Sequence, residues 1–273
     1  MDEGKTITIE YRSVEHLGPE RMPELAADLV RVRVDLIVVT GVQSALAAKK
    51  ATTTIPIVIA SAPDPVGLGL VASLARPGGN VTGLSSLTPE LNTKRLEILT
   101  DAIPKLARVG LLWQPARAAG GGDIQLKELR AAAAALKLKL EVIETQPDAR
   151  GLESGFQTAK QKQVGAIMTS ASRPFFAERK RIVELAAKYR LPAIYVQKEF
   201  VDDGGLMSYG ANYTDLFRKA AHYVDKILKG AKPGDLPVQQ ATKFEFVINL
   251  KAAKQIGLIL SPEFLARANQ VLK

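Results

Sequence analysis

Four short loops collect hydroxyl, amide and carboxylate side chains, and each loop directly follows a short apolar run. The first loop spans residues 40–44 and comes after DLIVV, at the start of a helical pattern. Backbone N–H groups at the start of a helix attract anions such as a carboxylate, and Thr40 or Ser44 can add a hydroxyl. An ordinary Thr or Ser helix cap is the alternative interpretation. The pattern thus predicts either an anion-binding corner or a plain helix start.

The second loop, residues 61–67, follows IPIVIA and holds Asp64 between two prolines. Proline fixes the backbone φ angle, so the loop is stiff, and the Asp64 carboxylate can cap the helix expected to follow it. The same carboxylate can instead pair with the ammonium group of a ligand. Both interpretations of Asp64 stay open from the residues alone.

The third loop, residues 169–174, follows GAIM and is the counterpart of the first loop in the second half of the chain. Small hydroxyl side chains at the end of a strand can hydrogen-bond a ligand without crowding it. Arg173 can reach a carboxylate from here, or can simply remain solvated. The loop therefore predicts a second group of ligand contacts.

The fourth loop, residues 208–213, follows GGLM at the point where we expect the chain to cross between two lobes. Tyr209 can stack on a flat ligand, and Asn212 can hydrogen-bond it. A turn followed by an Asn cap at residue 212 is the alternative.

Catalytic and metal-binding patterns find little support. Cysteine is absent, the two histidines His16 and His222 are far apart, and neither GxSxG nor HExxH occurs. The glycines at 120–122 lack the lysine and hydroxyl spacing of a phosphate loop. We therefore expect no catalytic residue, no bound metal and no cofactor, and a protein that is not an enzyme.

The elements that must position these loops are short strands alternating with helices. The apolar runs are rich in β-branched residues and have strand length, and helical patterns separate them. The expected strands are 7–11, 36–39, 55–60, 81–84, 109–113, 138–143, 166–168, 192–196 and 206–208. The expected helices are 21–33, 43–52, 66–75, 88–102, 123–136, 151–162, 174–190 and 213–229.

Alternation of this kind predicts βαβ crossovers and parallel sheets, in an α/β fold of two doubly wound, Rossmann-like lobes. The two halves align element by element, but the first half has no counterpart of the strand and helix at 109–138. In a sheet of order 2-1-3-4-5 that missing strand would be central. We therefore expect the first lobe to lack its first strand, which leaves 7–11 and 36–39 without their shared neighbour.

Two such lobes predict a ligand clamp. Ligands of open α/β sheets bind beyond the carboxyl ends of the strands, and closure about a hinge can bury a ligand held between two lobes. The four loops all fall at expected strand ends, so we expect one interlobe cleft that binds a small molecule without transforming it.

Composition narrows the class of partner. With 37 basic and 28 acidic residues the formal net charge is +9, which suits either nucleic acid and anionic membranes or a dispersed solubilising charge. The basic residues are scattered along helices without interleaved aromatics, so we expect dispersed charge and no nucleic-acid partner. No apolar run reaches the roughly 20 residues of a membrane span, and residues 1–5 do not resemble a signal peptide.

Long motifs in these regions make the chain recognisable. It resembles the tryptophan/tyrosine-type ABC transporter substrate-binding family, a branch of the type I periplasmic binding proteins, through ARPGGNVTGLS, GGLMSYGANYTDLFR, ELNTKRLEIL and SPEFLARANQVL among other stretches. The similarity extends over nearly the whole chain. Family members usually begin with a signal peptide and a further strand, loop and helix before the segment GKTITIEYR.

The resemblance implies a clamp with three hinge crossings, near 103–107, 209–212 and 238–242. It assigns 1–105 with 212–237 to lobe 1, and 106–211 with 238–273 to lobe 2. It implies a protein outside the cytoplasm, periplasmic or lipid-anchored, that delivers a small solute, often an aromatic amino acid or related carboxylate, to a permease with a separate ATPase. We expect a monomer, because a closing clamp needs no partner subunit. The ligand contacts it implies are Thr40, Gly41, Gln43, Ser44, Ala62, Asp64, Ser170, Ala171, Tyr209 and Asn212.

Two other functions compete with transport. An enzyme on the same fold class would need convergent titratable groups, whereas the four loops offer mainly Ser, Thr, Asn and backbone. A sensory or regulatory ligand-binding module on the same fold is the stronger alternative. Neighbouring permease and ATPase genes would favour transport, and a neighbouring kinase or cyclase gene would favour sensing.

Overall fold

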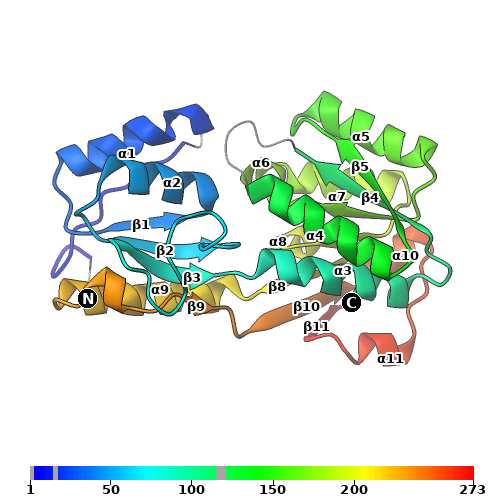
Figure 1. Ribbon diagram of the computed structural model, residues 1–273. Coiled ribbons are helices and arrows are strands. Elements are labelled where there is room, and N and C mark those ends of the chain that lie inside the picture. The colour runs from blue at the N-terminus through cyan, green and yellow to red at the C-terminus, as the bar shows by residue number, and fades with distance from the viewer. Residues whose placement is uncertain (1–2, 15–17, 115–120) are drawn as a thin grey trace. The chain divides into compact units, whose positions relative to one another are not determined.

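The computed structural model describes residues 3–14, 18–114 and 121–273, which form two compact units (Figure 1). The first unit comprises Met1–Leu87 with Asn212–Thr242, and the second comprises Thr88–Ala211 with Lys243–Lys273. The chain therefore passes from one unit to the other three times, after residues 87, 211 and 242.

The first unit is built on a parallel sheet of order β1-β2-β3-β9. Apolar side chains of β1, β2 and β3 form its core together with residues of α2, while α9 packs on β2 and β3. Helices α1 and α2 lie side by side (Figure 1). The bounds are α1 Met22–Arg31, β1 Ile37–Thr40, α2 Val42–Ala51, β2 Ile57–Ala62, β3 Val81–Ser85, α9 Tyr213–Leu228 and β9 Gln239–Gln240.

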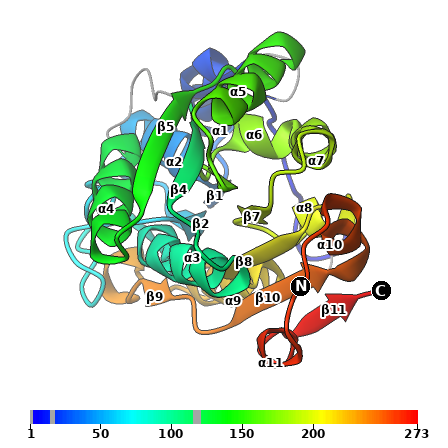
Figure 2. The same ribbon diagram turned by 90° about the vertical axis from the view of Figure 1, so that its right-hand side faces the viewer.

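The second unit is built on a seven-stranded sheet of order β11-β10-β8-β7-β6-β4-β5, in which only β8 and β10 pair antiparallel among the described strands. Helices α3 and α4 cover one face, and α5 and α7 cover the other (Figure 2). The bounds are α3 Thr88–Ala102, β4 Arg108–Trp113, α4 Gly121–Ala135, β5 Lys139–Glu144, α5 Ala149–Gln161, β6 Ala166–Thr169, α7 Arg179–Lys188, β7 Ala193–Tyr195, β8 Met207–Ala211, β10 Phe244–Asn249 and β11 Gln270–Leu272.

Shorter elements complete the two units. They are helices of three to seven residues, and the sequence patterns did not predict them as separate elements. They comprise the 3-10 helices η1 Pro19–Arg21 and η2 Pro233–Asp235, and the helices α6 Arg173–Ala177, α8 Glu199–Asp202, α10 Leu250–Ile256 and α11 Pro262–Leu265.

The α/β class with two parallel-sheet lobes is confirmed, and each predicted strand from residue 36 onward is present. Within the second unit the strands β5-β4-β6-β7-β8 reproduce the doubly wound order 2-1-3-4-5. The predicted helix at 174–190 divides into α6 and α7 at Glu178. Hydrophobic periodicity therefore located the elements, and the order of the sheet followed from their alternation.

Two predicted elements are wrong. The strand at 7–11 does not form: among the described residues this segment makes only an isolated bridge between Glu3 and Ile7, and the side chain of Tyr11 is exposed. A strand needs a neighbour for its backbone hydrogen bonds, and the described residues supply none for this segment. The helix at 66–75 is a series of turns instead, because Gly69 adopts a positive φ of 65° that interrupts the helical path.

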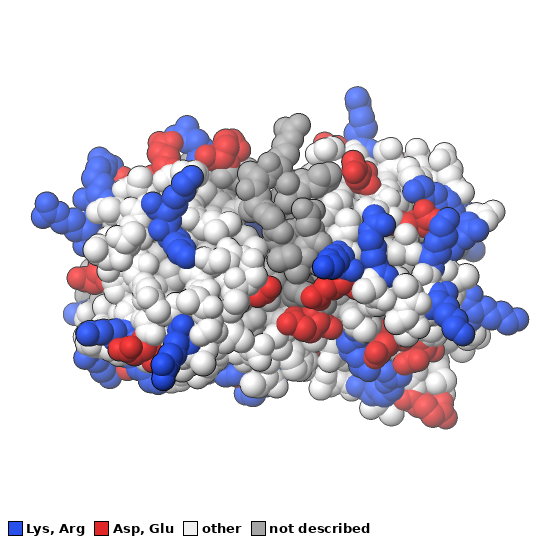
Figure 3. Space-filling view, in the orientation of Figure 1, with Lys and Arg blue, Asp and Glu red and all other residues white. Residues whose placement is uncertain are grey.

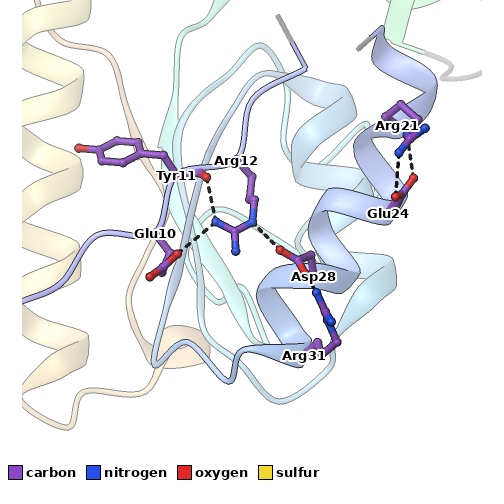
Figure 4. A network of polar contacts seen from close by, with 7 residues as sticks. All are labelled: Glu10, Tyr11, Arg12, Arg21, Glu24, Asp28 and Arg31. Atoms are coloured by element: carbon purple, nitrogen blue, oxygen red, sulfur yellow. Dashed lines mark hydrogen bonds and ion pairs between the residues drawn. The ribbon is translucent and has the colours of Figure 1, made fainter. Parts of the chain in front are cut away.

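Strand β1 is an edge strand of the described sheet, consistent with the gap in the internal repeat. Its counterpart β6 has β4 on the equivalent side. The segment before α1 is held by charge instead of by strand pairing: Arg12 donates from Nε to Asp28 at 2.5 Å, and Arg31 also pairs with Asp28 (Figure 4). A second ion pair, between Arg21 and Glu24, lies at the start of α1 (Figure 4).

The observed boundary between the units differs from the expected one at helix α3. The family resemblance assigned residues up to 105 to the first lobe, whereas the structure groups Thr88–Ala102 with the second unit. The reason is packing: α3 lies against α4 and β8, and its apolar residues Leu96 and Leu99 enter the core beneath that sheet. The last boundary likewise falls after residue 242, beyond the expected 237.

Charge is dispersed over the surface drawn in Figure 3, where Lys and Arg do not merge into one continuous patch. Several basic side chains share acidic partners, as when Lys139 and Lys162 both contact Glu141. Among the described residues, none of the helices has the length and apolar character needed to span a bilayer.

Candidate ligand-binding site

The carboxyl ends of β1 and β2 bring the first two predicted loops together. Thr40, the last residue of β1, is in register with Ser61 near the end of β2. Gly41 follows with a φ of 85°, and its N–H donates to the Ser61 carbonyl oxygen at 2.8 Å. A left-handed φ of this kind is readily adopted by glycine, so the sharp turn from strand to helix depends on Gly41.

Helix α2 begins directly after that turn. Ser44 donates its hydroxyl to the carbonyl oxygens of Thr40 at 2.6 Å and Gly41 at 3.2 Å, so it is used within its own turn. No side chain among the described residues caps the first N–H groups of α2, and Gln43 is exposed beside them. Uncapped N–H groups and the helix dipole together favour a negative group at this point.

Asp64 and Ala62 have different environments at the end of β2. Ala62 is fully buried, whereas Asp64 is half-buried and accepts from the Gly67 N–H at 2.9 Å through Oδ1. The carboxylate therefore closes a turn, which is the structural alternative considered for this residue. A methyl group on Gly67 would collide with the same carboxylate, so the turn depends on both residues.

The third loop lies at the carboxyl end of β6 in the second unit. The hydroxyl oxygens of Thr169 and Ser170 are buried and have no hydrogen-bond partner within the described chain. The Ser170 backbone N–H donates to the Leu112 carbonyl oxygen at 3.0 Å, which fixes the loop to β4. Ala171 is half-buried, and Ser172 caps α6 by accepting from the Phe175 N–H. Two hydroxyls are thus available for a ligand, and a third serves the fold.

Polar groups continue across the same face of this sheet. Met168 pairs with Ile194, so Thr169 and Tyr195 stand side by side one residue further on, and Tyr195 pairs with Ser208. The hydroxyls of Tyr195 and Ser208 are likewise buried without a partner in the described chain. Burial raises the pKa of Tyr195, so this phenol stays protonated.

Tyr209 lies on the opposite face of β8. Its ring stacks on Phe244 with centroids 6.4 Å apart and meets Phe246 edge to face at 6.3 Å, which leaves the side chain half-buried. Its backbone carbonyl accepts from the guanidinium of Arg95. Tyr209 is therefore positioned by an aromatic cluster and by a buried cation before any ligand is present.

Asn212 is the first residue of the chain after it leaves the second unit. Its Oδ1 accepts from the Asp215 N–H at 2.7 Å and caps α9, as the alternative interpretation proposed. The structure thus groups the predicted residues by unit: Thr40 to Asp64 and Asn212 belong to the first, and Ser170, Ala171 and Tyr209 to the second.

Two residues escaped the sequence analysis. Thr169 was placed in the third loop, after the expected strand 166–168, but not among the expected ligand contacts; its hydroxyl is buried without a partner in the described chain, as is that of Ser170. Arg95 lies in the expected helix 88–102 and drew no separate prediction, yet it is among the most buried side chains of the described protein. The signal for Arg95 was its spacing from Leu91, Leu99 and Ala102, which places it on the apolar stripe of α3.

The chemistry of these loops is that of recognition. Hydroxyls, backbone N–H groups and one turn-bound carboxylate can hydrogen-bond a small polar molecule, but they do not pair a general base with a nucleophile. No cluster of three or more potential metal ligands occurs among residues 3–14, 18–114 and 121–273.

The fold defines the class of protein. Two parallel-sheet units linked by three crossings, with polar loops at the ends of parallel strands, form the type I periplasmic binding protein architecture, and similar solved structures share it. The sequence profile described as "ABC transporter substrate binding protein" matches residues 1–272. The chain belongs to this family of binding proteins, whose members act outside the cytoplasm and are not enzymes.

Individual relatives agree with this assignment. A tyrosine-binding protein of Clostridioides difficile is 27% identical over 256 residues, which cover 94% of this chain and 72% of the relative. A Streptococcus pneumoniae ABC domain, solved in complex with L-Trp, is 27% identical with a TM-score of 0.84, covering 93% of this chain and 84% of that one. A conserved domain protein of Vibrio cholerae is 29% identical with a TM-score of 0.91, covering 99% of this chain and 89% of that one.

Proposed function

We propose that this protein binds an aromatic amino acid or a closely related small carboxylate and delivers it to an ABC permease driven by a separate ATPase. Its place of action is the periplasm, or the outer face of the membrane if the chain is lipid-anchored. The observation that carries the proposal is the pair of buried hydroxyls at the end of β6, Thr169 and Ser170, which have no hydrogen-bond partner in the described protein. Buried polar groups are nearly always satisfied, so a ligand is the natural partner.

The carboxylate of the ligand is assigned to the first turn of α2. Its N–H groups have no side-chain cap, and Gly41 turns the chain so that they follow the strand end directly. Oriented N–H groups and the helix dipole stabilise a carboxylate there, with Thr40 and Gln43 as neighbouring donors. Ser44 shapes this turn through its hydrogen bonds to Thr40 and Gly41.

The amino group and side chain of the ligand are assigned to the remaining loops. Asp64 keeps Oδ2 for an ammonium group while Oδ1 closes its own turn. Thr169, Ser170 and the Ala171 backbone supply the contacts from the second unit, and Tyr209 supplies an aromatic edge. Ala62 and Asn212 shape the backbone at their strand and helix ends.

Two relatives whose names state a tyrosine or tryptophan ligand support an aromatic side chain. We assign the chain as a monomer with one ligand, because the proposed contacts all come from a single copy.

Isothermal titration calorimetry of the protein with a panel of single amino acids tests this function. L-Tyr, L-Trp and L-Phe are compared with L-Leu and L-Lys, and with the amides of the aromatic amino acids, which lack the carboxylate. We expect one site with a Kd of about 1 µM for at least one aromatic amino acid, or about −8 kcal/mol, and binding to its amide at least tenfold weaker. Absence of heat with every aromatic amino acid would refute the assignment, and equal affinity for the amide would remove the α2 carboxylate contact.

A further inference from the structure

Helix α3 carries an arginine that is almost completely shielded from water. Arg95 is 1% exposed, although a guanidinium cannot lose its charge at physiological pH. Transfer of such a group out of water is costly unless hydrogen bonds replace its hydration. A fully buried cation outside the proposed ligand contacts therefore requires a function in the fold or in its motions.

The guanidinium joins its own helix to the backbone of strand β8. Nε donates to the Tyr209 carbonyl oxygen at 2.7 Å, and Nη1 donates to Asn92 Oδ1 at 2.7 Å. Glycine at residue 210 serves a different neighbour: a methyl group there would lie 2.0 Å from the Val196 carbonyl oxygen, whereas its 3.9 Å distance from Arg95 Nη2 is ordinary van der Waals contact. The contact between α3 and β8 is thus made by the hydrogen bond from Arg95 Nε, while Asn92 holds the guanidinium on its own helix.

This contact lies where the chain enters and leaves the second unit. Helix α3 is the first element after the crossing at 87–88, and Tyr209 comes three residues before Asn212, where the chain crosses again. Strand β10 starts just after the third crossing, and its Phe244 pairs with Ala211. Arg95 therefore links α3 to β8, and the pairing of β8 with β10 adds the element that follows the third crossing.

We propose that Arg95 is a positioning residue that holds the end of β8 against α3, so that the second unit presents all three crossings as one rigid block. Movement of the chain between the units is then confined to the crossings themselves, and Tyr209 is kept in the orientation in which it meets the ligand. The statement about Tyr209 rests on the proposed function, whereas the anchoring of β8 does not.

Arginine is required here for its geometry as well as its charge. Its planar fork directs Nε and Nη1 toward two different acceptors at once, whereas a lysine ammonium is a single point that reaches one of them well. Lysine in place of Arg95 is therefore the conservative variant that retains the charge and loses the double contact.

Backbone hydrogen exchange and ligand titration on Arg95→Lys and Arg95→Met test the proposal. Lys94→Met is the matched control, because Lys94 is a half-buried cation on the same helix that pairs with Glu97. We expect exchange of the β8 and β10 amides to accelerate by about 10- to 100-fold in the methionine variant, the change expected for loss of a hydrogen bond to a charged group. Strands β4 and β5 should keep their exchange rates, the lysine variant should lie between, and the control should match the wild type.

Binding of the aromatic amino acid should weaken by about tenfold in the methionine variant and less in the lysine variant. Equal acceleration of exchange in every strand, or unchanged rates in β8 and β10, would overturn the proposal, because a purely structural arginine lowers stability without singling out these strands. If Arg95→Met does not fold, Arg95→Lys and Asn92→Ala provide the same local comparison. A wild-type protein that binds no aromatic amino acid would refute the proposed function, while the exchange data would still decide the anchoring of β8.

Discussion

Replacement of Ser170 by alanine should have opposite effects on stability and on ligand affinity. The Ser170 hydroxyl is buried, with 7% of the residue exposed, and has no hydrogen-bond partner in the described chain. In the ligand-free protein its removal relieves an unsatisfied polar group, so the free energy of unfolding should stay constant or rise by about 1 kcal/mol. With ligand bound, the variant lacks a hydrogen bond worth about 1.4 kcal/mol, which is a tenfold rise in Kd.

Ser172→Ala is the matched control, two residues away in the same loop. The Ser172 hydroxyl accepts from the Phe175 N–H at 3.3 Å and caps α6, so its loss should lower the free energy of unfolding by about 1 kcal/mol and leave Kd unchanged. Urea denaturation without ligand and calorimetric titration with ligand measure the two quantities separately. A Ser170→Ala variant that is less stable and binds with unaltered affinity would refute the assignment of this hydroxyl to the ligand.

Three further perturbations follow from the same structure. Tyr195→Phe removes a buried hydroxyl without a partner in the described chain, so urea denaturation should show a free energy of unfolding higher by about 1 kcal/mol. A lower free energy of unfolding would mean that the hydroxyl is hydrogen-bonded. Gly83→Ala places a methyl group 2.1 Å from the Ile59 carbonyl oxygen at a φ of 137°, and should cost about 3 kcal/mol or prevent folding, whereas an unchanged midpoint would contradict this geometry. Hydrogen bonds from Lys188 and Tyr189 lower the pKa of Glu153 in the folded state. The contribution of Glu153 to the free energy of unfolding is therefore complete at pH values above its usual pKa of about 4.3, and it disappears as the pH falls through the lowered pKa. Glu153→Gln should therefore be less stable than the wild type at pH 7 and equal to it in acid, and a difference that persists in acid would argue against the ion pair.

The fold was largely predictable because its elements carry local patterns. Strands such as β2 are continuous apolar runs that are buried along their whole length, and runs of this kind separated by amphipathic helices specify parallel crossovers. The segment 7–11 has the same strand pattern and yet forms no strand, since pairing depends on a neighbour and not on composition. The predicted helix at 66–75 does not form for a local reason, which is the positive φ at Gly69.

The candidate site was predictable only in part. Strand ends followed by polar loops are visible in the sequence, because the topology of parallel sheets places them at one edge. Whether a hydroxyl caps a helix, as at Ser172, or remains available, as at Ser170, depends on tertiary contacts that spacing does not encode. The membership of α3 in the second unit and the burial of Arg95 are likewise set by packing between distant segments.

A crystal structure of the protein grown with the aromatic amino acid that binds with the lowest Kd would show where this ligand lies. We expect one molecule whose carboxylate accepts from the first N–H groups of α2 and which hydrogen-bonds the Ser170 hydroxyl. A ligand that touches neither the start of α2 nor the end of β6 would contradict the account.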